Sequence, residues 1–168
     1  MCIRDSANTS TISNFATVEK LELLRARFET LYISEQVFDE IQEGLTQGYD
    51  FYRDLKQQIF PFSETGWLHL ITLNTIDELM TFNQLLSKLH TGEASCLSIA
   101  YHRQWLFLSD DKAARQQSHA LNVPISGTLG ILLTLVKQQK LSLIEADTVL
   151  QQMIDKGYYS PVTSLRDI

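Results

Sequence analysis

The sequence is poor in cysteine and has no long apolar run, and each absence excludes some classes of protein. Its two cysteines, Cys2 and Cys96, are too few and too isolated for a disulfide framework or a zinc site, and they fit a reducing cytosol. No apolar run approaches the roughly 20 residues that a membrane-spanning helix needs, and the first residues lack the apolar core of a signal peptide. We therefore expect a cytoplasmic protein with no membrane segment.

The common signatures of nucleotide and acyl chemistry are also missing. The segment Gly127-Thr128-Leu129-Gly130 lacks the lysine of a phosphate-binding loop, and no G-x-S-x-G nucleophile elbow occurs. The four histidines form neither a ligand pair at i, i+4 spacing nor a cluster with cysteine. The carboxylates are therefore the main candidates for chemistry.

An excess of negative charge argues against broad, nonspecific binding of nucleic acid. The formal net charge is -6, whereas such binding needs a positive field. It does not exclude a nuclease, because a carboxylate metal site is itself acidic and a local basic strip can guide the substrate. Lys112 and Arg115 are candidates for RNA contact, as are Lys137 and Lys140, although a solvated surface is the better explanation of each.

Length and composition predict a single globular domain over residues 1–168, since 44% of the residues are apolar and 20% are charged. Apolar runs and helical spacing alternate along the chain. We expect strands at 30–33, 67–71, 105–108 and 123–125, and helices at 17–28, 34–45, 49–59, 75–89, 92–102, 112–120, 129–136 and 142–157. This alternation predicts the α/β class, as a three-layer α/β/α domain with a parallel central sheet.

Paired carboxylates follow the strand expected at 105–108. The run Ser109-Asp110-Asp111 stands between that strand and a helix, at the edge of a parallel sheet where ligands bind. Either aspartate could cap the helix, but capping needs one acceptor, and two adjacent carboxylates repel unless a cation or solvent screens them. The run therefore favours a divalent-metal site.

Glu93 and Glu40 are the other acids that could join such a site. Glu93 stands in the first turn of the helix expected at 92–102. It shares a helix face with Cys96, Leu97 and Ala100, so its side chain points along a buried face. The alternative is that it only complements the helix dipole. Glu40 falls on the rim of the apolar face of its helix, where a solvated flank is the alternative.

Read together, these segments resemble the PIN-domain family of metal-dependent ribonucleases, in particular a toxin-type, VapC-like branch of largely uncharacterised prokaryotic proteins. Asn8-Thr9-Ser10-Thr11-Ile12 is similar to the D/N-T-S-x-L opening, and the segment 33–40 is similar to the strand and helix that carry the second acid. Thr91-Gly92-Glu93-Ala94-Ser95 resembles the helix start with the third acid, Ser109-Asp110-Asp111 resembles the T-x-D motif, and the segment 127–133 resembles the G-T-L-G helix.

The resemblance implies a function and a set of site residues. It implies that Asn8, Glu40, Glu93 and Asp111 hold Mg²⁺ or Mn²⁺ directly or through water, and that this metal activates water and steadies the charge on a scissile phosphate. Asp110 would assist catalysis, and Ser10 or Ser109 would fix a ligand. It also implies an RNA substrate, a small antitoxin protein as partner and a possible homodimer.

Two departures from the family pattern bear on this expectation. The first acid is replaced by Asn8, whose amide oxygen could still coordinate a hard cation, with weaker affinity. The stretch before it carries Arg4 and Asp5 where the family has an apolar central strand, so we expect a poor strand there and take residues 1–6 to be non-native. Asp5 is not a substitute for the missing acid, because strand alternation turns it away from Asn8.

Three functions are therefore open at this point. The first is a Mg²⁺- or Mn²⁺-dependent endoribonuclease, the toxin of a toxin–antitoxin pair. The second is a catalytically inactive PIN-like module that binds RNA or a protein. The third is an unrelated α/β enzyme whose acids only cap helices.

Overall fold

A computed structural model describes residues 4–168 of the chain, so the suspected non-native start lies partly outside the described residues. Six strands form one sheet in which every neighbouring pair is parallel, in the order β3-β4-β2-β1-β5-β6. The strands are β1 (Asp5–Ala7), β2 (Leu31–Ser34), β3 (Ile59–Phe60), β4 (Leu68–Ile71), β5 (Leu106–Leu108) and β6 (Ile125–Ser126).

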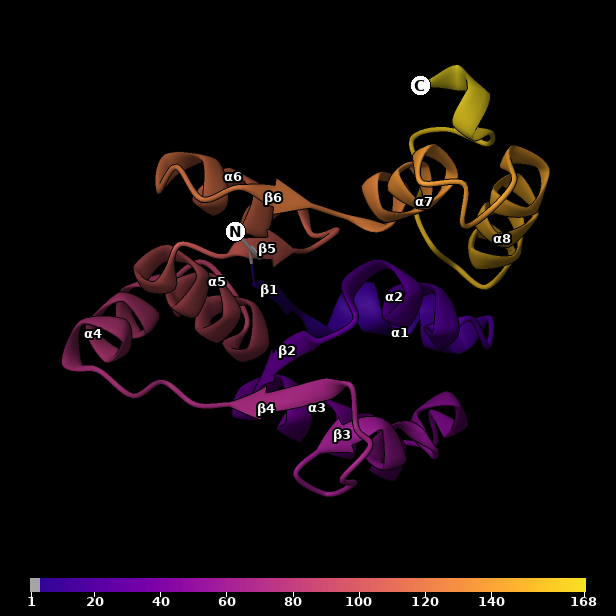
Figure 1. Ribbon diagram of the computed structural model, residues 1–168. Helices are drawn as coiled ribbons and strands as arrows, with labels where there is room; N and C mark the ends of the chain where they lie inside the picture. The colour runs from indigo at the N-terminus through magenta and orange to yellow at the C-terminus, as the bar shows by residue number, and fades with distance from the viewer. Residues whose placement is uncertain (1–3) are drawn as a thin grey trace.

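Helices cover both faces of this sheet (Figure 1). They are α1 (Thr9–Thr17), α2 (Leu21–Phe28), α3 (Glu35–Thr46), α4 (Ile76–Leu85), α5 (Thr91–Arg103), α6 (Lys112–Ala120), α7 (Thr128–Lys137) and α8 (Leu143–Asp155), with short 3₁₀ helices η1 (Asp50–Tyr52), η2 (Leu55–Gln58) and η3 (Leu165–Asp167). In Figure 1, α4, α5 and α6 lie on one side and α1, α2, α7 and α8 on the other. The expected three-layer α/β/α architecture is confirmed.

The central strand β1 corrects the expectation of a poor strand before Asn8. Asp5, Ser6 and Ala7 are all buried, and β1 pairs with β2 on one side and β5 on the other. The Ser6 hydroxyl is satisfied, because it donates to the Cys96 carbonyl at 3.3 Å. Asp5 is less well accommodated: burial raises its pKa to about 6, and the Arg27 charge opposes part of this shift. Asp5 begins the strand and Asn8 follows its end, so Asp5 lies away from the candidate site.

Three other expectations about the elements were wrong. The helix expected at 17–28 begins only at Leu21, as α2, because Thr17 ends α1 and the chain turns at Glu19 with a φ of 56°. The segment 49–59 forms η1 and η2 before it enters β3. The helix expected at 75–89 ends at Leu85, and the apolar residues that indicated it face solvent, with exposed fractions of 76% for Ile76 and 56% for Met80.

The sheet order places a crevice at the middle of the molecule. The chain runs outward from β1 to β2 and on to the edge strand β3, returns to place β4 between β3 and β2, and then crosses back to lay β5 on the other side of β1. Such a reversal of strand order opens a crevice outside the carboxyl ends of the central strands. Asn8 follows β1 and Ser109 follows β5 at this point, and the Asn8 N–H donates to the Leu108 carbonyl at 3.1 Å.

None of the helices in residues 4–168 is long and apolar enough to cross a membrane.

Candidate active site

A cleft of about 680 Å³ opens at this crevice. Glu40 and Glu93 line it, together with Asn8 and Ser10, and an apolar wall comes from Leu86 and Leu89. Its remaining lining residues are Thr9, Ser13, Glu43, His90 and Thr91. Within the part of the chain that the structure describes, no lysine or arginine lines the cleft, so its walls are acidic, polar or apolar.

Glu93 stands in the first turn of α5, half-buried at the cleft. Burial raises the pKa of its carboxyl group, and the negative charge of Asp111 raises it further. His90 opposes part of this shift, and the Glu40 charge adds the smallest contribution. Because Asp111 acts on Glu93 in this way, the structure brings these two predicted site residues within electrostatic reach of each other. Their charges are not neutralised by any ion pair that the structure shows among residues 4–168.

Glu40 reaches across from α3 to the start of α5. Its Oε1 accepts the Gly92 N–H at 2.8 Å and the Thr91 hydroxyl at 3.2 Å, and its Oε2 accepts the Thr9 hydroxyl. His90, the N-cap of α5, makes no side-chain capping bond, so Glu40 supplies that cap from another helix. A Cβ at Gly92 would lie 2.5 Å from Glu40 Oε2, which explains the glycine at this position.

The adjacent carboxylates Asp110 and Asp111 have different surroundings. Asp110 accepts hydrogen bonds from the Thr128 N–H and hydroxyl at 2.9 and 2.6 Å and from Asn14 Nδ2 at 3.2 Å. Weaker donors are the Thr11 and Tyr158 hydroxyls at 3.4 and 3.3 Å. Asp110 therefore ties α1, α7 and the C-terminal segment to the end of β5, and its oxygens are occupied by donors of the protein.

Asp111 caps α6 with a single oxygen. Its Oδ1 accepts the Ala114 N–H at 2.8 Å, and its backbone N–H donates to the Ser109 hydroxyl at 3.1 Å. The capping alternative for this residue is thus real, but it occupies one carboxylate oxygen only. Asp111 fits a metal ligand better than Asp110 does, because Asp110 is engaged on both oxygens.

Asn8 is buried and makes contacts on both ends of its amide. Its oxygen accepts the Thr11 N–H at 3.2 Å and the Ser10 hydroxyl at 3.0 Å, and its nitrogen donates to Ser109 Oγ at 2.8 Å and to Glu93 at 3.3 Å. The oxygen that was expected to coordinate a cation is therefore the N-cap of α1. Ser10 and Ser109 both contact Asn8, and their role in fixing a metal ligand stays a prediction.

The predicted RNA-contacting residues lie outside the cleft lining. Lys112 is exposed at the start of α6, and Arg115 is partly buried near Gly127, where it would meet an added Cβ at 2.5 Å. Thr9, His90, Thr91 and Gly92 are site residues that the sequence did not single out as functional. Their contacts depend on tertiary packing, so spacing along the chain carries no signal for them.

The donor set fits a magnesium or manganese ion held by few protein ligands. Among residues 4–168, no three His, Cys, Asp or Glu side chains converge closely enough to hold a metal together. Mg²⁺ is commonly bound through one or two carboxylates, with water and substrate phosphate completing its octahedron. Glu93 lines the cleft and Asp111 does not, and the role of the two as metal ligands stays a prediction.

A parallel sheet flanked by helices, with acidic residues after its central strands, is consistent with the nuclease-type fold of PIN domains. The sequence matches the model of the DUF3368 family, described as a PIN domain, over residues 7–168. The chain belongs to this PIN-domain family. No curated protein is significantly similar to it.

Proposed function

We propose that the protein is a divalent-metal-dependent ribonuclease. The observation that carries this proposal is the half-buried carboxylate of Glu93, whose pKa is raised by burial and by the charges of Asp111 and Glu40 and which has no ion-pair partner among the described residues. Clustered carboxylates in a partly buried site repel one another unless a positive charge joins them. A Mg²⁺ or Mn²⁺ ion supplies that charge, and when bound it also activates water and stabilises charge on a phosphate.

The residues of the chain divide this work among them. Glu93 and Asp111 would hold the ion. The Ser109 hydroxyl would fix Asp111 by accepting the hydrogen bond from the Asp111 backbone N–H. Glu40 would keep the first turn of α5 in place, through Gly92 and Thr91, so that Glu93 stays directed at the cleft. The apolar wall of Leu86 and Leu89 offers a surface on which a base of a single-stranded RNA can pack.

A toxin role with a small antitoxin partner is part of the proposal. It is supported by the resemblance to toxin-type PIN proteins and by an acidic cleft without lysine or arginine, which suits a basic side chain of an inhibitor. A homodimer is part of the same proposal. The inactive-module alternative is favoured by one observation, the hydrogen-bonded amide of Asn8 in place of the first acid.

RNA cleavage tests the proposal. We would incubate the protein with structured and single-stranded RNA in Mn²⁺ or EDTA, beside the Glu93→Gln variant and the Glu64→Gln control, which removes the same charge from an exposed loop. We expect cleavage that requires Mn²⁺, falls at least about 100-fold in Glu93→Gln and is unchanged in Glu64→Gln. Equal cleavage by Glu93→Gln, or none by the wild type, would contradict the proposal, and the second result would favour the inactive module.

A further inference from the structure

The orientation of the Asn8 amide is determined by its contacts. Asn8 is 1% exposed, and the backbone N–H of Thr11 points at one end of its amide at 3.2 Å. A backbone N–H can only donate, so that end is the carbonyl oxygen and the other end is the NH₂ group. The Ser10 hydroxyl, which donates to the same oxygen at 3.0 Å, agrees with this assignment.

The NH₂ group is consequently the part of Asn8 that faces the site. It lies 2.8 Å from Ser109 Oγ and 3.3 Å from Glu93 Oε1. Ser109 follows β5, Glu93 begins α5 and Asn8 follows β1, so one amide joins three elements at the crevice. An aspartate in the same place would cap α1 equally well but would turn a carboxylate oxygen toward Glu93.

We propose that Asn8 is a positioning residue that clamps Glu93 by donating a hydrogen bond, and that it is not a metal ligand. This inference rests on the proposed function, because it concerns the carboxylate that would hold the ion. It gives the two residues unequal roles: Glu93 binds the cation, and Asn8 holds Glu93. If both were ligands, the amide and the carboxylate could be exchanged between the two positions without loss.

Exchanging the two groups provides the test. The Asn8→Asp/Glu93→Gln double variant keeps one carboxylate and one amide, with the hydrogen bond reversed so that the glutamine donates to the aspartate. The two single variants, Asn8→Asp and Glu93→Gln, complete a double-mutant cycle with the wild type. We would measure the melting temperature in EDTA at pH 7.5, and Mn²⁺ binding by calorimetry, for all four proteins.

The clamp predicts a different result in each measurement. In EDTA, Asn8→Asp should melt several degrees lower because two carboxylates face each other, and the double variant should recover most of that loss. Its Mn²⁺ affinity should nevertheless fall at least about tenfold, because the carboxylate no longer stands at position 93.

Two results would overturn the inference. One is an Asn8→Asp variant that melts with the wild type in EDTA, since the amide would then not contact Glu93 closely. The other is a double variant that binds Mn²⁺ as tightly as the wild type, since both positions would then be ligands. A wild type that binds no Mn²⁺ contradicts the proposed function instead, and the melting temperatures in EDTA still decide whether Asn8 clamps Glu93.

Discussion

Two glutamates occupy the same position in successive helices, the third residue after the N-cap, and their surroundings differ sharply. Glu78 follows Thr75 in α4, and Glu93 follows His90 in α5. Glu78 is 1% exposed and forms an ion pair with Arg103 at 2.7 Å. Glu93 is half-buried beside other carboxylates.

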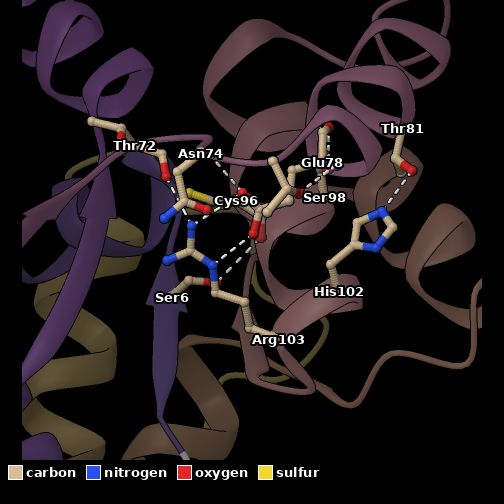
Figure 2. Close-up of polar contacts among 10 residues, drawn as sticks. Ser6, Thr72, Asn74, Glu78, Thr81, Cys96, Ser98, His102 and Arg103 are labelled. Atoms are coloured by element: carbon tan, nitrogen blue, oxygen red, sulfur yellow. Dashed lines mark hydrogen bonds and ion pairs between the residues drawn. The ribbon is translucent and has the colours of Figure 1, made fainter.

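Figure 2 shows how completely Glu78 is compensated. Arg103 donates to both of its oxygens, at 2.7 and 3.1 Å, and the Asn74 N–H donates at 2.8 Å. Burial alone would raise the pKa of Glu78, but these hydrogen bonds and the Arg103 charge hold it below its usual value. The Ser98 hydroxyl donates to the Glu78 carbonyl at 2.7 Å, and this contact also joins α4 to α5.

The comparison separates a structural carboxylate from a functional candidate. A buried charge is tolerated when the protein supplies its counter-charge, and Glu78 has one. The carboxylates at the cleft lack such a partner among residues 4–168, and under the proposed function their mutual repulsion would be relieved by a bound cation.

Removing Arg103 should break the comparison by making Glu78 resemble Glu93. We expect Arg103→Met to destabilise the protein by about 3–5 kcal/mol, because it leaves a buried carboxylate unpaired. The loss is measured by urea unfolding. The control is Arg53→Met, whose ion pair with Asp50 is equally short at 2.6 Å but exposed, and which should change stability by less than about 1 kcal/mol. Equal effects of the two variants would show that burial of the pair does not matter.

Variants of the neighbouring acids Asp110 and Asp111 should sharpen the comparison between a structural and a functional carboxylate. We expect Asp110→Ala to cost about 3 kcal/mol, because the Thr128 and Asn14 donors lose their acceptor. Asp111→Asn should cost less than about 0.5 kcal/mol, because asparagine caps α6 equally well, but it should weaken Mn²⁺ binding. Unfolding and calorimetry measure the two effects, and the reverse assignment would follow if Asp110→Ala were stable and Asp111→Asn bound Mn²⁺ normally.

Asp5 is another buried carboxylate, at the start of β1 and away from the cleft. Its pKa of about 6 lies above the ordinary value of 3.8, so the folded state holds its proton more tightly than the unfolded state. Its stabilising contribution is present below about pH 4 and is lost as the pH rises through about 6. We expect Asp5→Asn to stabilise the protein at pH 7.5 by up to about 3 kcal/mol and to remove this part of the pH dependence. Melting curves at several pH values check this, with Asp39→Asn on the exposed side of α3 as control.

The smallest expected effect concerns the Glu40 contact. Gly92→Ala would place a Cβ 2.5 Å from Glu40 Oε2 and displace the carboxylate that caps α5. We expect a loss of about 1 kcal/mol, and a smaller loss when the same change is made in Glu40→Ala, where the space is free. Additive effects in this double-mutant cycle would show that Gly92 and Glu40 do not interact.

The sequence predicted the fold well where one residue type fixes a local structure. Ser34 accepts the Val37 N–H as the N-cap of α3, and Ser142 caps α8 in a capping box with Glu145. Pro124, which has no N–H to donate to a strand ladder, precedes β6 at the sheet edge. Helix α1 escaped notice because its Ser and Thr residues have weak helix propensity. They are held by bonds such as Ser13 Oγ to the Thr9 carbonyl at 2.7 Å.

The candidate site was predictable as a set of residues but not as a set of contacts. The carboxyl edge of the sheet brings Asn8 beside Ser109, as the strand order requires. Which atom of Asn8 faces the site depends on the Thr11 N–H, and the engagement of Glu40 by Gly92 depends on the crossing of α3 and α5. Neither is encoded in spacing along the chain.

Calorimetric titration with Mn²⁺ tests the central claim most directly, that the uncompensated carboxylates of the cleft form a cation site. The proteins are the wild type, Glu93→Gln and the exposed-loop control Glu64→Gln, all at pH 7.5. We predict that the wild type and the control bind Mn²⁺ equally and that Glu93→Gln binds it at least about tenfold more weakly. A wild type that binds no Mn²⁺, or a Glu93→Gln variant that binds it as tightly as the control, would contradict the account.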